Sequence, residues 1–123
     1  MTISIYSSLP SMDHIFSIDI EGEKTKMRFT GQFTYRRPTI SKRSEIAKTV
    51  AKMNGDQQSN LDDYTKDMNQ IIGWLEHCLI EFPSWWKESN YGRDLYDDNV
   101  ISELSAQIMR FEEQWQTQIG KPQ

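Results

Sequence analysis

The fold is decided between residues 14 and 40, where the chain reads HIFSIDIEGEKTKMRFTGQFTYRRPTI. Apolar and polar residues alternate on both sides of Gly22, so each run has one apolar face, as a half-buried strand does. The short polar segment around Gly22 is typical of a turn. The stretch therefore predicts an antiparallel β-hairpin over residues 13–37, which Pro38 ends because it has no N–H to donate.

Helical periodicity follows Pro38 and predicts three helices within residues 39–119. Capping and stop residues mark their ends. The first helix is expected to begin after Thr39 or Ser41 and close at Asn54-Gly55, the second to run from Asn60 to Pro83, and the third to begin after Asp97 or Asp98. The predicted fold class is α+β: an N-terminal antiparallel β-hairpin followed by three helices, with the last two long and packed antiparallel.

Length and composition predict a single domain of 123 residues and 14.5 kDa. Residues 1–12 show little pattern and are expected to form a flexible or docking arm. No apolar run approaches the ~18 to 20 residues that a membrane span needs, so no membrane partner is expected. The one cysteine, Cys78, excludes an internal disulfide framework.

Basic residues concentrate in the first half of the chain. Nine of them lie between Lys24 and Lys52 with only Glu45 among them, although the whole chain carries a net charge of −4. Such a cluster fits a protein partner or a second copy, an ordinary solvated surface, or the phosphates of nucleic acid. The acidic total disfavours nucleic acid, and a protein partner or second copy is the preferred interpretation.

A catalytic or metal site is not predicted. His77 and Cys78 are helical neighbours, whose side chains point about 100° apart and do not face each other. His14 has no second ligand at metal-binding spacing, and the paired acids fit helix capping and solvation. The sequence contains no GxxxxGK[ST], GxGxxG or GxSxG motif. We therefore expect no enzymatic activity, no metal and no cofactor.

Aromatic residues cluster near position 85. Phe82, Trp85 and Trp86 lie within five residues of one another. Two interpretations remain open: the tryptophans plug the end of a helix pair, or at least one of them anchors a partner chain, since Trp and Tyr are enriched at binding hot spots. The candidate partner-binding residues come from this cluster, from two arginines of the basic cluster and from one tryptophan of the last helix. They are Trp85, Trp86, Tyr91, Arg36, Arg37 and Trp115.

The order of these features resembles a known family. FTYRRPTI at residues 33–40 ends the hairpin and leads directly into a helix, and FPSWW at residues 82–86 follows the long second helix. An Asp-rich loop and a last helix carrying Phe111 complete the pattern, which covers about residues 25–115. In these motifs and their order the chain is similar to the tail assembly chaperones of long-tailed bacteriophages.

The resemblance implies a non-enzymatic helper in the host cytoplasm that binds the tape-measure protein, keeps it soluble and helps to recruit tail-tube subunits. The client would be held around Trp85, Trp86 and the apolar seam of the last helix, and a homo-oligomer is a further option. One alternative is a structural virion component (a tail, baseplate or head–tail connector subunit) in which the basic hairpin pairs edge to edge with its neighbours. A second is a small regulator that binds nucleic acid through Lys24–Lys52.

Overall fold

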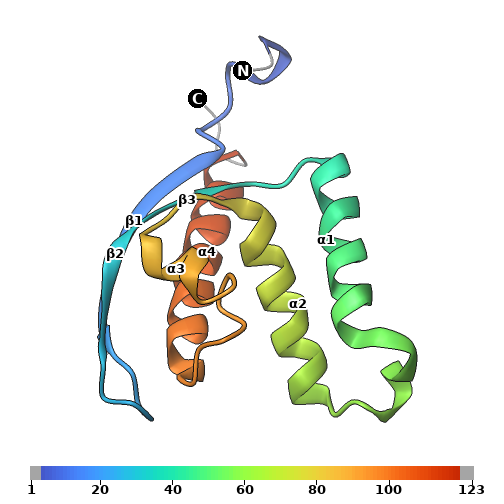
Figure 1. Ribbon diagram of the computed structural model, residues 1–123. Helices are drawn as coiled ribbons and strands as arrows, with labels where there is room; N and C mark the ends of the chain where they lie inside the picture. Colours follow the sequence, from blue (N-terminus) through green and yellow to red (C-terminus); the bar gives the residue numbers. More distant parts are fainter. Residues whose placement is uncertain (1–3, 120–123) are drawn as a thin grey trace.

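The computed structural model describes residues 4–119, apart from the side chains at positions 4, 57 and 58. Its elements in chain order are η1 (Ser4–Tyr6), β1 (Asp13–Glu21), β2 (Arg28–Arg36), α1 (Ile40–Asn54), η2 (Gly55–Asn60), α2 (Asp63–Cys78), β3 (Leu79–Glu81), α3 (Ser84–Glu88) and α4 (Asp98–Ile119). The expected α+β class is confirmed. Residues 1–3 of the expected arm lie outside the described part. η1 at the start of the described chain lies beyond the end of the sheet (Figure 1), whereas Met12 accepts a backbone hydrogen bond from Arg37.

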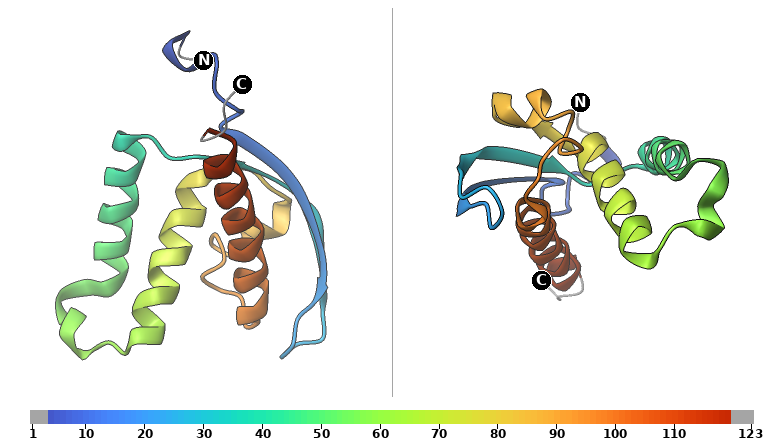
Figure 2. Two further views of the ribbon diagram at one scale, coloured as in Figure 1. Left: turned by 180° about the vertical axis from the view of Figure 1, so that it is seen from behind. Right: turned by 60° about the horizontal axis from the view of Figure 1, so that its bottom comes forward.

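β1 and β2 form the predicted hairpin. The two strands pair antiparallel, with Phe16 opposite Phe33 and Ile18 opposite Gly31. Phe16, Ile18 and Phe33 are all buried on one face, as the alternation predicted. The helices lie on this apolar side only, so the opposite face of the sheet has no helix over it (Figures 1 and 2).

β3 is a strand that the sequence did not predict. The second helix was expected to reach Pro83, but it ends at Cys78, and the next three residues pair antiparallel with β2. Leu79 lies opposite Tyr35 in this pairing and is buried. The expectation was wrong because residues 79–82 continue the helical spacing of apolar side chains. The hydrogen bonds that favour a strand come from β2, which is distant in sequence.

The core lies between the sheet and the helices α2 and α4. The largest fully buried side chains come from all of these elements and from α3: Trp86, Tyr35, Phe33, Leu75, Leu104 and Ile108. α4 runs along the sheet, where Phe111 stacks on the ring of His14 with 4.7 Å between ring centroids. α1 lies outermost, beyond α2 (Figures 1 and 2).

α2 and α4 run in the same direction in both ribbon views (Figures 1 and 2). Their starts meet, because the Tyr64 hydroxyl donates a hydrogen bond to the Asp98 carboxylate. The expected antiparallel packing of the last two long helices is therefore wrong. β3, α3 and the loop after α3 carry the chain back to the end at which α2 begins. The antiparallel neighbours are α1 and α2, which a hydrogen bond between Asn54 and Asn69 joins near their connection.

The helix ends follow the capping signals in part. Thr39 caps α1 as expected, since its hydroxyl accepts a hydrogen bond from the first turn, and Gly55 follows α1 with φ of 69°. α2 is capped by Asp62 and not by Asn60. The expectation placed the cap two residues too early because residues 55–60 form the turn η2. A carboxylate at this position also suits the positive end of the helix dipole.

Asp97 holds the hairpin turn against the start of α4. Its side chain is 1% exposed, and its Oδ1 accepts the N–H of Lys24 at 2.6 Å and the N–H of Thr25 at 3.0 Å. The Thr25 hydroxyl donates to the other carboxylate oxygen. A glycine is needed at position 22, because a Cβ there would overlap the Asp97 carboxylate. One buried carboxylate thus joins two segments that lie 72 residues apart in sequence.

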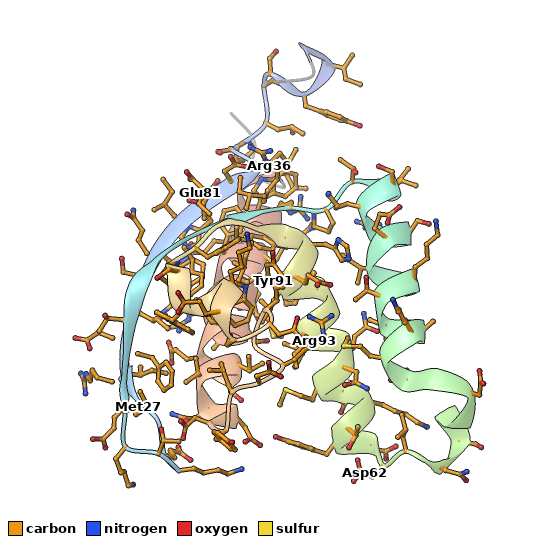
Figure 3. The ribbon with its side chains drawn as sticks, viewed as in Figure 1. Met27, Arg36, Asp62, Glu81, Tyr91 and Arg93 are labelled. Atoms are coloured by element: carbon orange, nitrogen blue, oxygen red, sulfur yellow. The ribbon has the colours of Figure 1, made fainter. Side chains whose placement is uncertain are left out.

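The loop between α3 and α4 is held against α2. The Arg93 guanidinium lies 3.2 Å from the Glu76 carboxylate, and Figure 3 places Arg93 between the loop and α2. Asn90, Tyr91 and Gly92 have φ angles of 56°, 55° and 88°, so the loop makes a left-handed turn just after α3. This turn brings Gly92 against Trp86.

Acid is expected to weaken the connection between the hairpin turn and α4. Hydrogen bonds from Thr25 and Lys24 lower the pKa of Asp97, and those from Tyr64 and Lys24 lower the pKa of Asp98 to about 2. A carboxyl group whose pKa is lower in the folded chain than in the unfolded chain stabilises the folded state. The contribution is complete at a pH above the unfolded pKa, about 3.9, and it is lost as the pH falls through the folded pKa.

We therefore expect Asp97→Asn to lower the free energy of unfolding near neutral pH. We also expect the free energy of unfolding of this variant to fall less steeply as the pH is lowered. Urea unfolding followed between about pH 5 and about pH 2.5 measures both effects. Asp56→Asn, at an exposed position in η2, is the matched control for removing one carboxylate. If the free energy of unfolding of Asp97→Asn falls in acid as steeply as that of the original chain, this role of Asp97 is contradicted.

Candidate functional site

Trp86, one of the expected partner-binding residues, is a core residue. Its side chain is 0% exposed, and its ring meets Phe33 and Trp85 edge to face with centroids 6.1 and 6.2 Å apart. Its indole N–H has no hydrogen-bond partner among the described residues. Trp86 presents no surface to another protein, so the expectation that it anchors a partner is corrected, because α3 turns this ring into the core.

Trp85 closes the edge of β2 that β3 leaves unpaired. Its indole N–H donates to the Thr30 carbonyl at 2.8 Å, and its half-buried ring lies edge-on to Phe29 with centroids 5.2 Å apart. Pro83 lies over Gly31, where a Cβ would be 2.6 Å from the proline ring. The Pro-Ser-Trp-Trp segment therefore covers the sheet edge with Pro83 and Trp85 and fills the core with Trp86.

Arg37 and Trp115 contact each other at one end of α4. The Arg37 guanidinium lies 3.7 Å from the centroid of the Trp115 ring and 2.8 Å from the Glu112 carboxylate. The Trp115 indole N–H donates to the Ser11 carbonyl at 3.1 Å, and its side chain is buried. Both residues are thus engaged within the chain and connect the hairpin end to α4.

Arg36 and Tyr91 lie apart from these residues and from each other. Arg36 makes an exposed ion pair with Asp13 at 2.8 Å on the outer face of the sheet, and Figure 3 shows it on β2. Tyr91 is half-buried in the loop after α3, with its ring edge-on to Phe82. The six expected partner-binding residues do not gather into one site. The apolar seam of the last helix is also closed, because Ile101, Leu104 and Ile108 are buried.

A groove of about 560 Å³ lies between α1 and α2. It is lined mostly by apolar residues of the two helices: Pro38, Arg43, Ile46, Ala47, Val50, Ala51, Asn54, Gln70, Ile71 and Trp74. The chain builds it by helical spacing, since residues three and four apart lie on one face of a helix. Ile46 and Val50 form the buried side of α1, whereas the small side chains of Ala47 and Ala51 beside them leave open space.

Gly73 brings the two helices close together. A Cβ at this position of α2 would lie 2.7 Å from a methyl group of Val50, so only glycine permits this approach. One turn further along α2, His77 Nε2 lies 2.7 Å from Thr49 Oγ1 of α1. The hydrogen bond places the C-terminal end of α2 beside the middle of α1 and fixes how the two helices are aligned.

Trp74 connects the groove to the core. It is half-buried, and its ring meets Tyr35 edge to face with centroids 5.7 Å apart. The Tyr35 hydroxyl in turn donates to Glu112 on α4 at 3.1 Å. Burial is the main reason that the pKa of Tyr35 is raised, so this hydroxyl is held as a hydrogen-bond donor.

The sequence interpretation missed the groove residues, above all Trp74, Ala47 and Ala51. A usable signal was present in the first helix. Ala47 and Ala51 directly follow Ile46 and Val50. The apolar side of this helix is therefore wider than contact with one neighbouring helix requires. Trp74 gave no such signal, because its distance from the core depends on where α1 and β2 lie.

The groove supplies binding surface and no reactive group. The one thiol, that of Cys78, is buried, and burial raises its pKa to about 12, which makes it unreactive near neutral pH. Within residues 4–119, no three His, Cys, Asp or Glu side chains are placed to hold a metal ion together. None of the helices described is both long and apolar enough to span a membrane.

Comparisons of this chain with protein-family models, with curated proteins and with solved structures found no match.

Proposed function

We propose that this chain is a non-enzymatic protein of phage tail morphogenesis, similar to a tail assembly chaperone. It binds the tape-measure protein in the host cytoplasm and helps to recruit tail-tube subunits. The client site is the groove between α1 and α2, where one amphipathic helix of the tape-measure protein is held. The observation that carries this proposal is an apolar groove beside a half-buried tryptophan, in a chain whose motifs resemble those of the family.

The shape and chemistry of the groove suit a helix. Two antiparallel helices form its walls, and an amphipathic helix can lay its i, i+3, i+4 and i+7 side chains into such a groove. Trp74 belongs to the residue types that dominate binding energy at interfaces. Ala47 and Ala51 are exposed and small, so a guest helix meets little obstruction along α1.

The observations give less support to a structural virion subunit built by edge-to-edge pairing. The long edge strand of the sheet is β1, which carries Asp13, Asp19 and Glu21, whereas Arg28 and Arg36 of the hairpin lie on the central strand β2. Two antiparallel β1 strands centred on Ser17 would place Asp13 opposite Glu21, and like charges in that arrangement repel.

Nucleic-acid binding is also less well supported. Five of the nine bases between Lys24 and Lys52 are in ion pairs: Lys24 with Asp98, Arg28 with Asp19, Arg36 with Asp13, Arg37 with Glu112 and Lys48 with Glu45. These pairs neutralise much of the charge that would face phosphate groups.

Ala47→Glu is expected to weaken client binding at least about tenfold while the chain stays folded. The substitution puts a longer, charged side chain on the wall of the apolar groove, where its bulk obstructs a guest helix and docking would remove the carboxylate from water. Co-expression of each variant with the tape-measure protein, followed by pull-down and circular dichroism of the purified chain, measures both properties. Ala106→Glu is the matched control, because Ala106 is an exposed alanine of α4 away from the groove.

Equal binding by both variants would contradict the proposed client site. Mass spectrometry of purified phage particles tests the wider role. A chaperone is expected to be present in infected cells and absent from particles, whereas a fixed copy number in particles would make the chain a structural subunit.

A further inference from the structure

The two ends of the α1–α2 groove carry opposite charges. Arg43 lines the groove near the start of α1. Asp67 precedes the lining residues Gln70 and Ile71 by three and four positions on α2, so it lies on the same side of that helix. Because α1 and α2 are antiparallel, as the contact between Asn54 and Asn69 shows, these two residues lie toward opposite ends.

Neither charge has a partner within the described part of the chain. Both side chains are exposed, and neither makes an ion pair or a side-chain hydrogen bond there. This contrasts with the arginines of the hairpin, which pair with acids of β1 and α4. The groove therefore has an unpaired cation toward one end, an unpaired anion toward the other, and apolar side chains between them.

Exposed apolar surface continues past the cationic end. Ile40 is 86% exposed and lies seven residues, or nearly two turns, before Ala47, so both face the same side of α1. With Ala51 one turn further on, these residues form an apolar strip along the outer wall of the groove. The strip extends the apolar surface of the groove, and contiguous exposed apolar surface marks sites of interaction, unlike a single exposed side chain.

An occupant that fits this surface must carry an anion opposite Arg43, a cation opposite Asp67 and an apolar strip between them. The same face of a second copy meets these conditions when the two copies are related by a two-fold axis, because rotation brings Arg43 of each copy to Asp67 of the other. We propose that two copies of this chain associate through these faces, with α1 and α2 of both copies forming a four-helix arrangement.

The proposal predicts a salt-sensitive dimer of the purified chain. Sedimentation equilibrium should give twice the chain mass of 14.5 kDa at high protein concentration, and added salt should weaken the association because the charge pairs are at the surface. Arg43→Asp and Asp67→Arg should each weaken self-association about tenfold or more, since each turns both attractive pairs into repulsive ones.

Mixing the two variants distinguishes a second copy from any other occupant. A copy with Arg43→Asp and a copy with Asp67→Arg are complementary at both contacts, so the mixture should form a heterodimer although each variant alone is weakened. Combining both substitutions in one chain should restore the homodimer. Lys48→Asp is the matched control, because it reverses an exposed charge of α1 on the side away from the groove and should leave the dimer intact.

A monomeric original chain at millimolar concentration would overturn the proposal. So would a dimer whose affinity does not change in the single variants, or a mixture that associates no better than its components. The inference does not rest on the proposed function, but a second copy and a client helix would occupy the same groove, so the tape-measure protein should dissociate the dimer as it binds. A chain that dimerises through these faces but binds no tape-measure protein would count against the function, whereas a chain that binds the client but stays monomeric without it would count against this inference.

Discussion

Trp86→Ala is expected to lower the free energy of unfolding by about 3 to 5 kcal/mol, which is the usual cost of truncating a fully buried aromatic side chain. The Trp86 side chain is 0% exposed and lies between the sheet and the loop after α3. Its removal takes away the edge-to-face contacts with Phe33 and Trp85 and leaves a cavity that the surrounding backbone cannot close.

Trp85→Ala is the comparison that separates the two adjacent tryptophans. It removes a half-buried ring and the hydrogen bond to the Thr30 carbonyl, so we expect a smaller loss of roughly 1 to 3 kcal/mol. Urea unfolding of both variants at neutral pH measures the difference. An equal or larger loss for Trp85→Ala would contradict the placement of Trp86 as the central core residue.

Gly92→Ala is expected to lower the free energy of unfolding by about 3 to 5 kcal/mol through two effects that add. Position 92 has φ of 88°, a conformation that strains any residue with a Cβ. A Cβ there would also lie 2.7 Å from the Trp86 ring and 2.8 Å from Ile101, in a part of the core that has no room for it.

Two further variants separate strain from overlap. Gly55→Ala places a Cβ at φ of 69° with no atom within 4 Å, so it reports strain alone, about 1 to 3 kcal/mol. Trp86→Phe removes the ring atoms that the new Cβ of Gly92→Ala would overlap. The double variant Gly92→Ala/Trp86→Phe should therefore lose less stability than the sum of the single variants, and strict additivity would contradict the overlap.

Some of the fold could be predicted because the forces that form it act within a few residues. The hairpin follows from side chains that alternate along each strand, and its apolar face is the buried one. The start of α1 follows from Thr39 directly after Pro38, where a hydroxyl can accept a hydrogen bond from the first helical turn. In these places the local preference and the tertiary structure agree.

The candidate site could be predicted far less well. Trp85 and Trp86 are the same residue type at adjacent positions, yet one covers a sheet edge and the other fills the core. The difference arises because neighbouring residues of α3 point in different directions, and the position of β2 decides which direction is inward. The groove depends in the same way on Gly73, because it exists only where α1 and α2 approach each other.

By itself the sequence determined the α+β class, the hairpin and the capping of α1, because alternation, proline and capping groups act over a few residues. Tertiary structure alone decided that Leu79–Glu81 is a strand, that α2 and α4 run in the same direction, and that Asp97 binds the hairpin turn. These features depend on contacts such as Thr25 with Asp97 and Thr34 with Glu81, which join residues 72 and 47 positions apart. Such contacts become favourable only after the rest of the chain has brought the groups together, since closing the intervening loop costs entropy.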